Sequence, residues 1–139
     1  MMLETLHLLA TVFMVGVIAF VQVVHYPLMA RVGAGHFASY ESGHTARTGW
    51  IVIPPMVIEA VTALWLAVES VGTPSAAPAL VGAGLVGVIW VSTALLQAPA
   101  HGRLIRGFDE VTHRRLVLGN WIRTVAWIFR VPIAVLLLP

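Results

Sequence analysis

Three histidines of this sequence stand at the borders of its apolar runs. His25 closes the first run, His44 lies in the polar segment that follows, and His101 comes just after the third run. Neutral imidazoles bind metal ions and haem iron. They also relay protons, because their unperturbed pKa of about 6.5 allows either protonation state near neutrality. These histidines are therefore the first candidates for a functional centre, with His25 and His101 at its core.

Two charged residues lie within apolar segments at matching depths. Glu59 stands nine residues after Trp50, and Arg130 stands nine residues after Trp121. Ionisable groups at membrane depth usually face the protein interior and pair with one another. The matching depth predicts that Glu59 and Arg130 face each other, either as an ion pair that locks two helices or as the floor of a site.

Other polar residues fall on shared helix faces. Gln97 and His101 are four residues apart, and Gln22 and His25 are three apart, so each pair shares a face. A longer stripe follows steps of three, four and three residues: Asn120, Arg123, Trp127 and Arg130. A stripe with two arginines cannot face lipid, so we expect it to point into a helical bundle. Asn120 and Arg123 then join the two histidines and Glu59 around one polar site.

Three kinds of chemistry fit these residues. Imidazole and carboxylate ligands suit zinc, iron or copper, and the predicted metal ligands are His25, His44, Glu59 and His101. A haem held by His25 and His101 is the second, with Asn120 as a further cofactor contact and arginines for the propionates. In the third, a histidine acts as general base and Arg123 or Asn120 stabilises an enolate-like oxygen. The predicted catalytic residues are His25, Glu59, His101 and Arg123. No metal-binding spacing such as HExxH selects among the three.

Composition indicates the elements that must position these residues. Of 139 residues, 59% are hydrophobic and 10% are charged, and the mean hydropathy is +0.92. These values predict an all-α integral membrane protein of one domain, 1–139. Four runs are close to the roughly 20 apolar residues of a spanning helix, namely 6–28, 50–68, 79–96 and 116–138. We therefore expect a four-helix bundle with interfacial helical connectors on one face.

The arginines predict the orientation of the bundle. Six of the eight fall in the two long connectors: Arg31, Arg47, Arg103, Arg106, Arg114 and Arg115. Positive charge is retained on the cytoplasmic side, so we expect cytoplasmic connectors and outward-facing termini in the inner membrane. The first apolar run is too long for a signal peptide and follows Glu4 instead of a basic segment, so it is interpreted as a retained span. The absence of cysteine excludes thiolate sites, and the few basic residues argue against nucleic-acid binding.

Several local expectations complete the sequence-based picture. Pro54 and Pro55 should kink or unwind the second span near Glu59. Asp109 should cap the start of an interfacial helix over 104–116. A faint internal repeat matches Gln22 and His25 with Gln97 and His101, which predicts two hairpins related by an axis along the membrane normal. The remaining histidines are expected to be ordinary interfacial residues: His7, His36 and His113.

The chain resembles small bacterial membrane proteins related to anthrone oxygenases. The resemblance rests on 25-HYP-27, 37-FASYESGH-44, Glu59 and 119-GNWIRTVAWIFR-130. It implies a four-helix membrane bundle and an apolar substrate that is aromatic or quinone-like. No catalytic signature carries over, so the matches at His25, Glu59, Asn120 and Arg123 mark positions without assigning roles.

Two classes of function follow from these observations. One is a metal- or haem-dependent oxidoreductase acting on an aromatic or quinone-like molecule, with the polar site at the cytoplasmic end of the bundle. The alternative is a non-enzymatic protein that binds or transports a small ligand, or an accessory subunit of a larger membrane complex. The small residues of 82-GAGLVGVIW-90 let helices approach closely. This close approach could be used for packing within the bundle, for a homodimer or for contact with another membrane protein.

Overall fold

The computed structural model describes all 139 residues, and every regular element in it is a helix. The prediction of an all-α chain is confirmed. In chain order the elements are α1 (Met2–Phe20), the π-helical turn η1 (Val21–His25), α2 (Tyr26–Met29), α3 (Ala34–Glu69), α4 (Ala76–Ser92), the π-helical turn η2 (Thr93–Gln97), α5 (Ala98–Leu104) and α6 (Glu110–Leu136).

Three helical stretches are long and apolar enough to cross a membrane. They are Met2–Met29, which joins α1, η1 and α2, then Ala34–Glu69, which is α3, and Ala76–Leu104, which joins α4, η2 and α5. The fourth long helix, α6, is not among them, although its run was predicted as a span. Four of the eight arginines lie on α6, which lowers its hydropathy relative to the other three stretches.

The long polar connectors predicted from the sequence are mostly parts of the long helices. Only Ala30–Gly33 and Ile105–Asp109 remain between helices at this end, and Gly33 and Gly107 adopt the positive φ values that these sharp turns require. Asp109 does cap a helix, because its carboxylate accepts a hydrogen bond of 2.7 Å from the Thr112 amide. Hydrogen bonds from Thr112 lower the pKa of Asp109. The capped helix is α6 itself, so the separate interfacial helix predicted over 104–116 does not form.

Each half of the chain repeats one arrangement of elements. A long α-helix runs into a five-residue π-helical turn, a short α-helix follows, and a second long helix completes the half. Pro27 and Pro99 each stand two residues after the π-helical turn. Proline has no amide hydrogen, so the regular hydrogen-bond ladder must break there, and a wider turn absorbs the break. This register matches His25 with Gln97, whereas the sequence comparison had matched it with His101.

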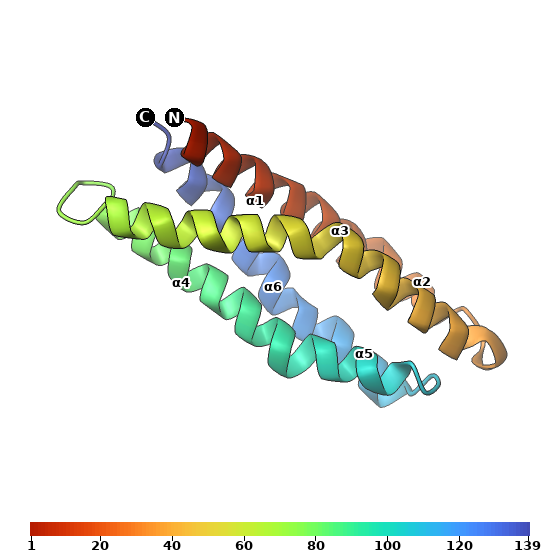
Figure 1. The fold of residues 1–139 in the computed structure, drawn as a ribbon. Helices are drawn as coiled ribbons and strands as arrows, with labels where there is room; N and C mark the ends of the chain where they lie inside the picture. The colour runs from red at the N-terminus through yellow and green to blue at the C-terminus, as the bar shows by residue number, and fades with distance from the viewer.

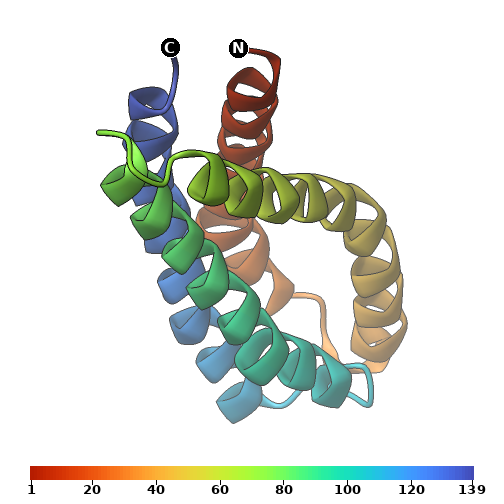
Figure 2. The same ribbon diagram turned by 60° about the vertical axis from the view of Figure 1, so that its left-hand side comes forward.

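The long helices form a closed ring around the centre of the molecule. Both α1 and α4 pack against α3 and against α6, and the two chain termini lie together at one end (Figure 1). Pro54 and Pro55 lie inside α3, which stays helical throughout but bends in its middle (Figure 2). The expected kink is therefore present and the expected unwinding is not.

Two apolar clusters fill the interior. One lies at the end near the short connections and is built from Val21, Tyr26, Met29, Phe37, Ala100, Leu104 and Leu116. The other lies deeper and contains Met14, Ile18, Met56, Ile89, Ala126 and Trp127. Buried polar side chains gather beside these clusters around three centres, Glu59, Glu41 and Asn120, and they provide the candidate chemistry.

Candidate functional site

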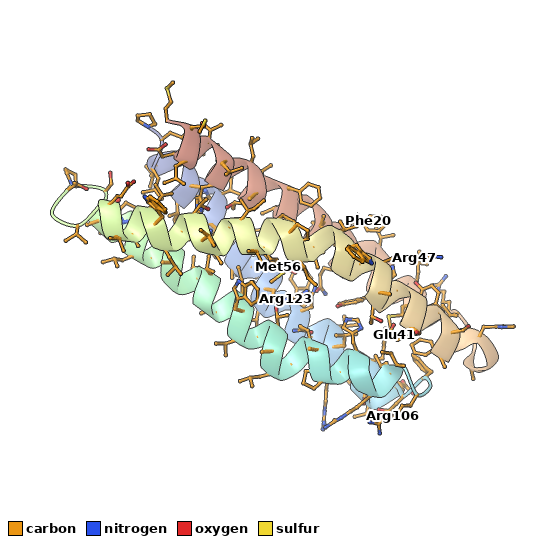
Figure 3. The ribbon with its side chains drawn as sticks, viewed as in Figure 1. Phe20, Glu41, Arg47, Met56, Arg106 and Arg123 are labelled. Carbon is orange, nitrogen blue, oxygen red and sulfur yellow. The ribbon has the colours of Figure 1, made fainter.

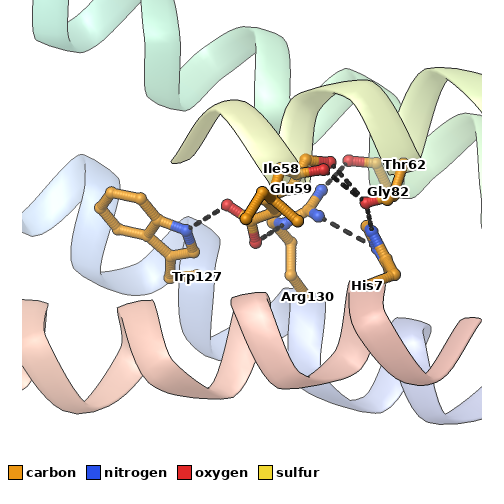
Figure 4. A network of polar contacts seen from close by, with 7 residues as sticks. All are labelled: His7, Ile58, Glu59, Thr62, Gly82, Trp127 and Arg130. Carbon is orange, nitrogen blue, oxygen red and sulfur yellow. Dashed lines mark hydrogen bonds and ion pairs between the residues drawn. The ribbon is translucent and has the colours of Figure 1, made fainter. Parts of the chain in front are cut away.

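The first polar group centres on Glu59 and Arg130, which the sequence predicted to face each other. The Arg130 Nε donates to Glu59 Oε1 at 3.0 Å, and the Trp127 indole donates to Glu59 Oε2 at 2.8 Å (Figure 4). Arg130 also donates through Nη1 to the Gly82 carbonyl. The predicted ion pair is therefore confirmed, and both oxygens of its carboxylate are occupied by donors.

Arg130 fixes the direction of the hydrogen bonds that continue to α1. A guanidinium only donates, so the His7 Nε2, 3.2 Å from Arg130 Nη2, must accept. The hydrogen of this neutral imidazole is then on Nδ1, which donates to the Thr62 hydroxyl at 2.7 Å. Thr62 in turn donates to the Ile58 carbonyl at 2.8 Å. His7, expected to be an ordinary interfacial histidine, is instead 2% exposed and part of a buried network.

We call this set the Glu59 network, and it consists of His7, Glu59, Thr62, Trp127 and Arg130. It joins α1, α3 and α6 through side chains and α4 through the Gly82 carbonyl (Figure 4). None of its side chains is more than 4% exposed. Its charges compensate each other and its polar atoms are paired. We therefore interpret it as a structural lock, meaning a network whose role is to hold the four helices together.

The second polar group surrounds Glu41 and His101. Glu41 is fully buried on α3, and its Oε1 accepts a hydrogen bond from His101 Nδ1 on α5. In the neutral imidazole Nε2 is then free to accept, and the Tyr26 hydroxyl lies 3.2 Å from it. Tyr26, His101 and Glu41 thus form a hydroxyl–imidazole–carboxylate chain. This is the order that general-base sites use to orient an imidazole and to stabilise its protonated form.

His44 and His25 extend this group toward the surface. The rings of His25 and His44 stack with centroids 4.2 Å apart, and the His44 ring is 5.5 Å from that of His101. Two buried atoms here have no hydrogen-bond partner, Glu41 Oε2 and His25 Nε2. We call Tyr26, His25, Glu41, His44 and His101 the histidine cluster. In contrast to the Glu59 network, its polar atoms are only partly satisfied.

A cavity of about 360 Å³ lies beside the histidine cluster. Its deeper wall is apolar and includes Met14, Ile18, Val52, Met56 and Trp127. Its polar lining consists of Tyr26, His44, Thr45, Thr48, Thr93, Gln97, His101 and Arg123. Ile53 on α3 and Ile105 after α5 also line it and are 58% and 39% exposed, so the cavity opens to the surface between these two segments. We call it the central cavity.

Arg123 is held at the central cavity by residues of three helices. Its Nε donates to Asn120 Oδ1 and its Nη1 donates to Thr93 Oγ1, both at 3.0 Å. Asn120 is itself fixed because its amide donates to Gln22 Oε1 at 2.7 Å. Figure 3 shows Arg123 among the helices, whereas Arg106 points away from them. Asn120 therefore acts as the support of Arg123, at 0% exposure and outside the lining of the central cavity.

The structure brings together some of the predicted site residues and separates others. His44, His101 and Arg123 line the central cavity, while His25 lies behind His44 and lines a shallower surface pocket. Glu59 does not line the cavity and belongs to the other network. The His44 ring packs against His25 and lies near His101, so no haem-sized space separates the two histidines predicted as its ligands. No group of three or more histidine or acidic side chains is arranged to hold a metal ion.

Sequence reasoning missed Glu41, Tyr26 and His113 as site residues. The segment containing Glu41 was interpreted as a connector, yet it is helical. Counting back along α3 from Met56 through Val52, Thr48 and Thr45 leads to Glu41 in steps of three or four. That continuation of a buried face was the available signal. His113, expected at the interface, is 8% exposed and donates from Nε2 to the Tyr26 carbonyl at 2.9 Å.

Comparison of the chain with known protein families, curated proteins and solved structures found no match. The resemblance to proteins related to anthrone oxygenases stays a prediction. The histidine cluster and the central cavity are therefore the features of the chain from which a function can be inferred.

Proposed function

We propose that this chain is an integral membrane four-helix protein that binds a small lipid-soluble molecule in the central cavity and exchanges a proton with it through His101. The observation that carries the proposal is the position of the Tyr26–His101–Glu41 chain at the polar end of an otherwise largely apolar cavity. A pocket with apolar walls and a few convergent polar groups is the usual form of a small-molecule site.

The surface of α6 supports its assignment as a fourth membrane span. Its charged Arg130 is 1% exposed, whereas the apolar residues on its other side are exposed: Leu118, Ile122, Val125, Phe129 and Leu136. An inward polar stripe and an outward apolar one suit a helix packed among three others in lipid. The connector arginines at one end of the bundle support an orientation in the inner membrane with that end in the cytoplasm and both termini outside. A cysteine at residue 106 should then be labelled only from the cytoplasm, and one at residue 75 only from outside.

The opening of the central cavity favours a ligand that arrives from the bilayer. Ile53 and Ile105 form part of its rim, and both present apolar surface outward. A lipid-soluble molecule can pass this rim without losing apolar contact. The resemblance to proteins related to anthrone oxygenases adds that the ligand is aromatic or quinone-like. The ring of Trp127 in the cavity wall offers a surface on which an aromatic body can stack.

The arrangement suits proton removal from a carbon next to a carbonyl group or conjugated with one. The proton passes to His101 Nε2, directly or through the Tyr26 hydroxyl, and Glu41 stabilises the resulting imidazolium. The electron pair of the broken C–H bond moves to the carbonyl oxygen, and Arg123 can donate to the enolate oxygen. Return of the proton to oxygen or to another carbon completes an isomerisation. A positioned base of this kind typically contributes about 10²–10⁴-fold.

Anthrone is a suitable probe, because its carbonyl acidifies the CH2 group across the same ring through conjugation with the fused aromatic rings. Its hydrogen–deuterium exchange is followed by NMR under argon, with the protein in lipid nanodiscs. Wild-type protein should accelerate the exchange over empty nanodiscs, and His101→Ala should reduce the rate to background. The matched control is His36→Ala, which removes an exposed histidine outside the cavity. Equal rates for wild type and His101→Ala would refute proton transfer by His101.

The same samples separate the other functions. Saturable binding of anthrone without accelerated exchange would indicate a binding or transport protein. An absence of binding would favour an accessory subunit, for which the small residues of α4 offer a contact: a Cβ added at Gly84 or Gly87 meets open space, while one at Gly82 would approach Ile133 to 3.2 Å. An absorption spectrum and elemental analysis complete the set, since a Soret band or stoichiometric metal would indicate the metal- or haem-dependent oxidoreductase instead.

A further inference from the structure

Arg123 carries a positive charge that no acidic side chain of the chain compensates. The only carboxylates in ion pairs are Glu4, Glu41 and Glu59, and none of them pairs with Arg123. Its hydrogen-bond acceptors are the neutral oxygens of Asn120 and Thr93. The guanidinium carbon lies 5.6 Å from the centroid of the Trp127 ring, another neutral partner. The central cavity therefore has a cation in its wall and no anion of its own beside that cation.

Arg130 shows what a fully compensated arginine looks like in the same helix. It lies seven residues further along the same stripe of α6 and is paired with Glu59. Arg123 differs in that it faces a cavity instead of a carboxylate. Arginine stays protonated in proteins, and Arg123 is partly buried, so its charge is either solvated from the cavity or balanced there by a bound anion.

Gln97 is a second and independent sign of a polar group in the cavity. Its side chain is 2% exposed and lines the central cavity, and its Oε1 has no hydrogen-bond partner. The Nε2 of the same amide makes one long contact of 3.5 Å with Ser92 Oγ. Buried amide oxygens normally accept a hydrogen bond. A water that hydrates the head group of a bound molecule would supply the missing donor, whereas a carboxylate itself only accepts.

We propose that the central cavity binds a lipophilic monocarboxylate, with the carboxylate against Arg123 and the apolar body along Met14, Val52 and Met56. The inference rests on the proposed function for the use of the cavity, and it adds the charge and head group of the ligand. The planar guanidinium matches a carboxylate in shape and charge. A neutral molecule of the same size would fill the apolar part of the cavity and leave Arg123 uncompensated.

Paired acids and esters test the charge of the ligand directly. Binding of radiolabelled laurate, anthracene-9-carboxylate and their methyl esters is measured at pH 8 on protein in detergent, with empty micelles subtracted. The wild type should bind at least one acid tenfold or more tighter than its ester. The linear and ring-shaped pairs show which kind of apolar body the cavity accepts.

Three variants assign the preference to Arg123. Arg123→Gln should abolish the preference for the acid while affinity for the ester stays within about twofold, and Arg123→Lys should keep most of it. Arg106→Gln removes an equal charge from an exposed position outside the cavity and should leave the preference unchanged. Should Arg123→Gln fail to fold, the acid–ester comparison in the wild type and in Arg123→Lys decides the question.

The outcomes keep the two proposals apart. Equal affinities of acid and ester in the wild type, or an acid preference that survives in Arg123→Gln, overturn the assignment of a carboxylate ligand and leave the cavity as a site for neutral molecules. If none of the four compounds binds while anthrone does, the carboxylate ligand fails and the proposed function stands; if anthrone does not bind either, both fail.

Discussion

The Glu59 network and the histidine cluster are two buried polar groups of the same bundle, and they differ in how completely they are satisfied. In the network, both Glu59 oxygens and three nitrogens of Arg130 have partners. In the cluster, Glu41 Oε2 and His25 Nε2 have none, and the cavity beside it adds the unpartnered Gln97 Oε1. Of the network only Trp127 lines the central cavity, whereas Tyr26, His44 and His101 of the cluster all line it.

The difference separates stability from function. A buried polar group with all partners in place holds a structure and has no capacity left for a ligand. A partly satisfied group beside a cavity costs stability in the free protein, and a bound molecule can repair it. We therefore assign the Glu59 network to the fold and the histidine cluster to ligand chemistry. Equivalent substitutions in the two groups should therefore differ strongly in their effect on stability.

The largest effect is expected from breaking the Glu59 network on one side. Glu59→Gln leaves the Arg130 charge buried without its counter-ion, which should destabilise the protein by about 3–5 kcal/mol. The double variant Glu59→Met with Arg130→Met removes both charges and should recover most of that loss. Unfolding of purified protein in detergent measures both. A single variant as stable as the wild type would show that the network is not the lock.

A smaller effect on stability is expected when Arg123, the arginine at the central cavity, is replaced instead. Arg123→Gln loses two hydrogen bonds to neutral oxygens but also removes a charge without a counter-ion, so its net cost should be about 1–2 kcal/mol. Arg130→Gln, the matched change in the same helix, removes the partner of a buried carboxylate and should cost more. Parallel thermal melts compare the two, and equal shifts in Tm would contradict the division into lock and site.

The smallest effect on stability is expected at Glu41, although it is as deeply buried as Glu59. Glu41→Gln keeps an oxygen that accepts from His101 Nδ1 and removes a carboxylate oxygen that has no partner. We expect the stability to change by no more than about 1 kcal/mol, while exchange of anthrone hydrogens falls because the imidazolium loses its stabilising charge. Melts and exchange rates on the same preparation test this. A large loss of stability would show that Glu41 has a structural role like that of the Glu59 network.

The repeated arrangement of the two halves does not produce a second site. The π-helical turns lie 72 residues apart, whereas contacts between the two halves join residues 71 apart, as in Glu59 with Arg130 and Phe37 with Phe108, whose rings are 4.9 Å apart. At a spacing of 71, Glu41 corresponds to Thr112 and His44 to Arg115, and at 72 they correspond to His113 and Leu116. At either spacing the second half has no carboxylate in place of Glu41 and no imidazole in place of His44.

The sequence by itself determined the helical class and the Glu59–Arg130 pair. Apolar runs of spanning length leave no alternative to helices in lipid, and two charges at equal depth have few partners other than each other. It also indicated His101 and Arg123 as inward-facing, because helical spacing alone places residues on a common face.

Only the tertiary structure decided which polar residues meet. Glu41 and His101 form a hydrogen bond although they are 60 residues apart in the sequence. No local sequence pattern links a carboxylate on α3 to an imidazole on α5. The contact joins the part of α3 before its bend to α5, which follows the π-helical turn η2. Helical periodicity fixes a residue's direction around its own helix. Which side chain it meets, and whether an oxygen is left without a partner, depends on how separate helices pack.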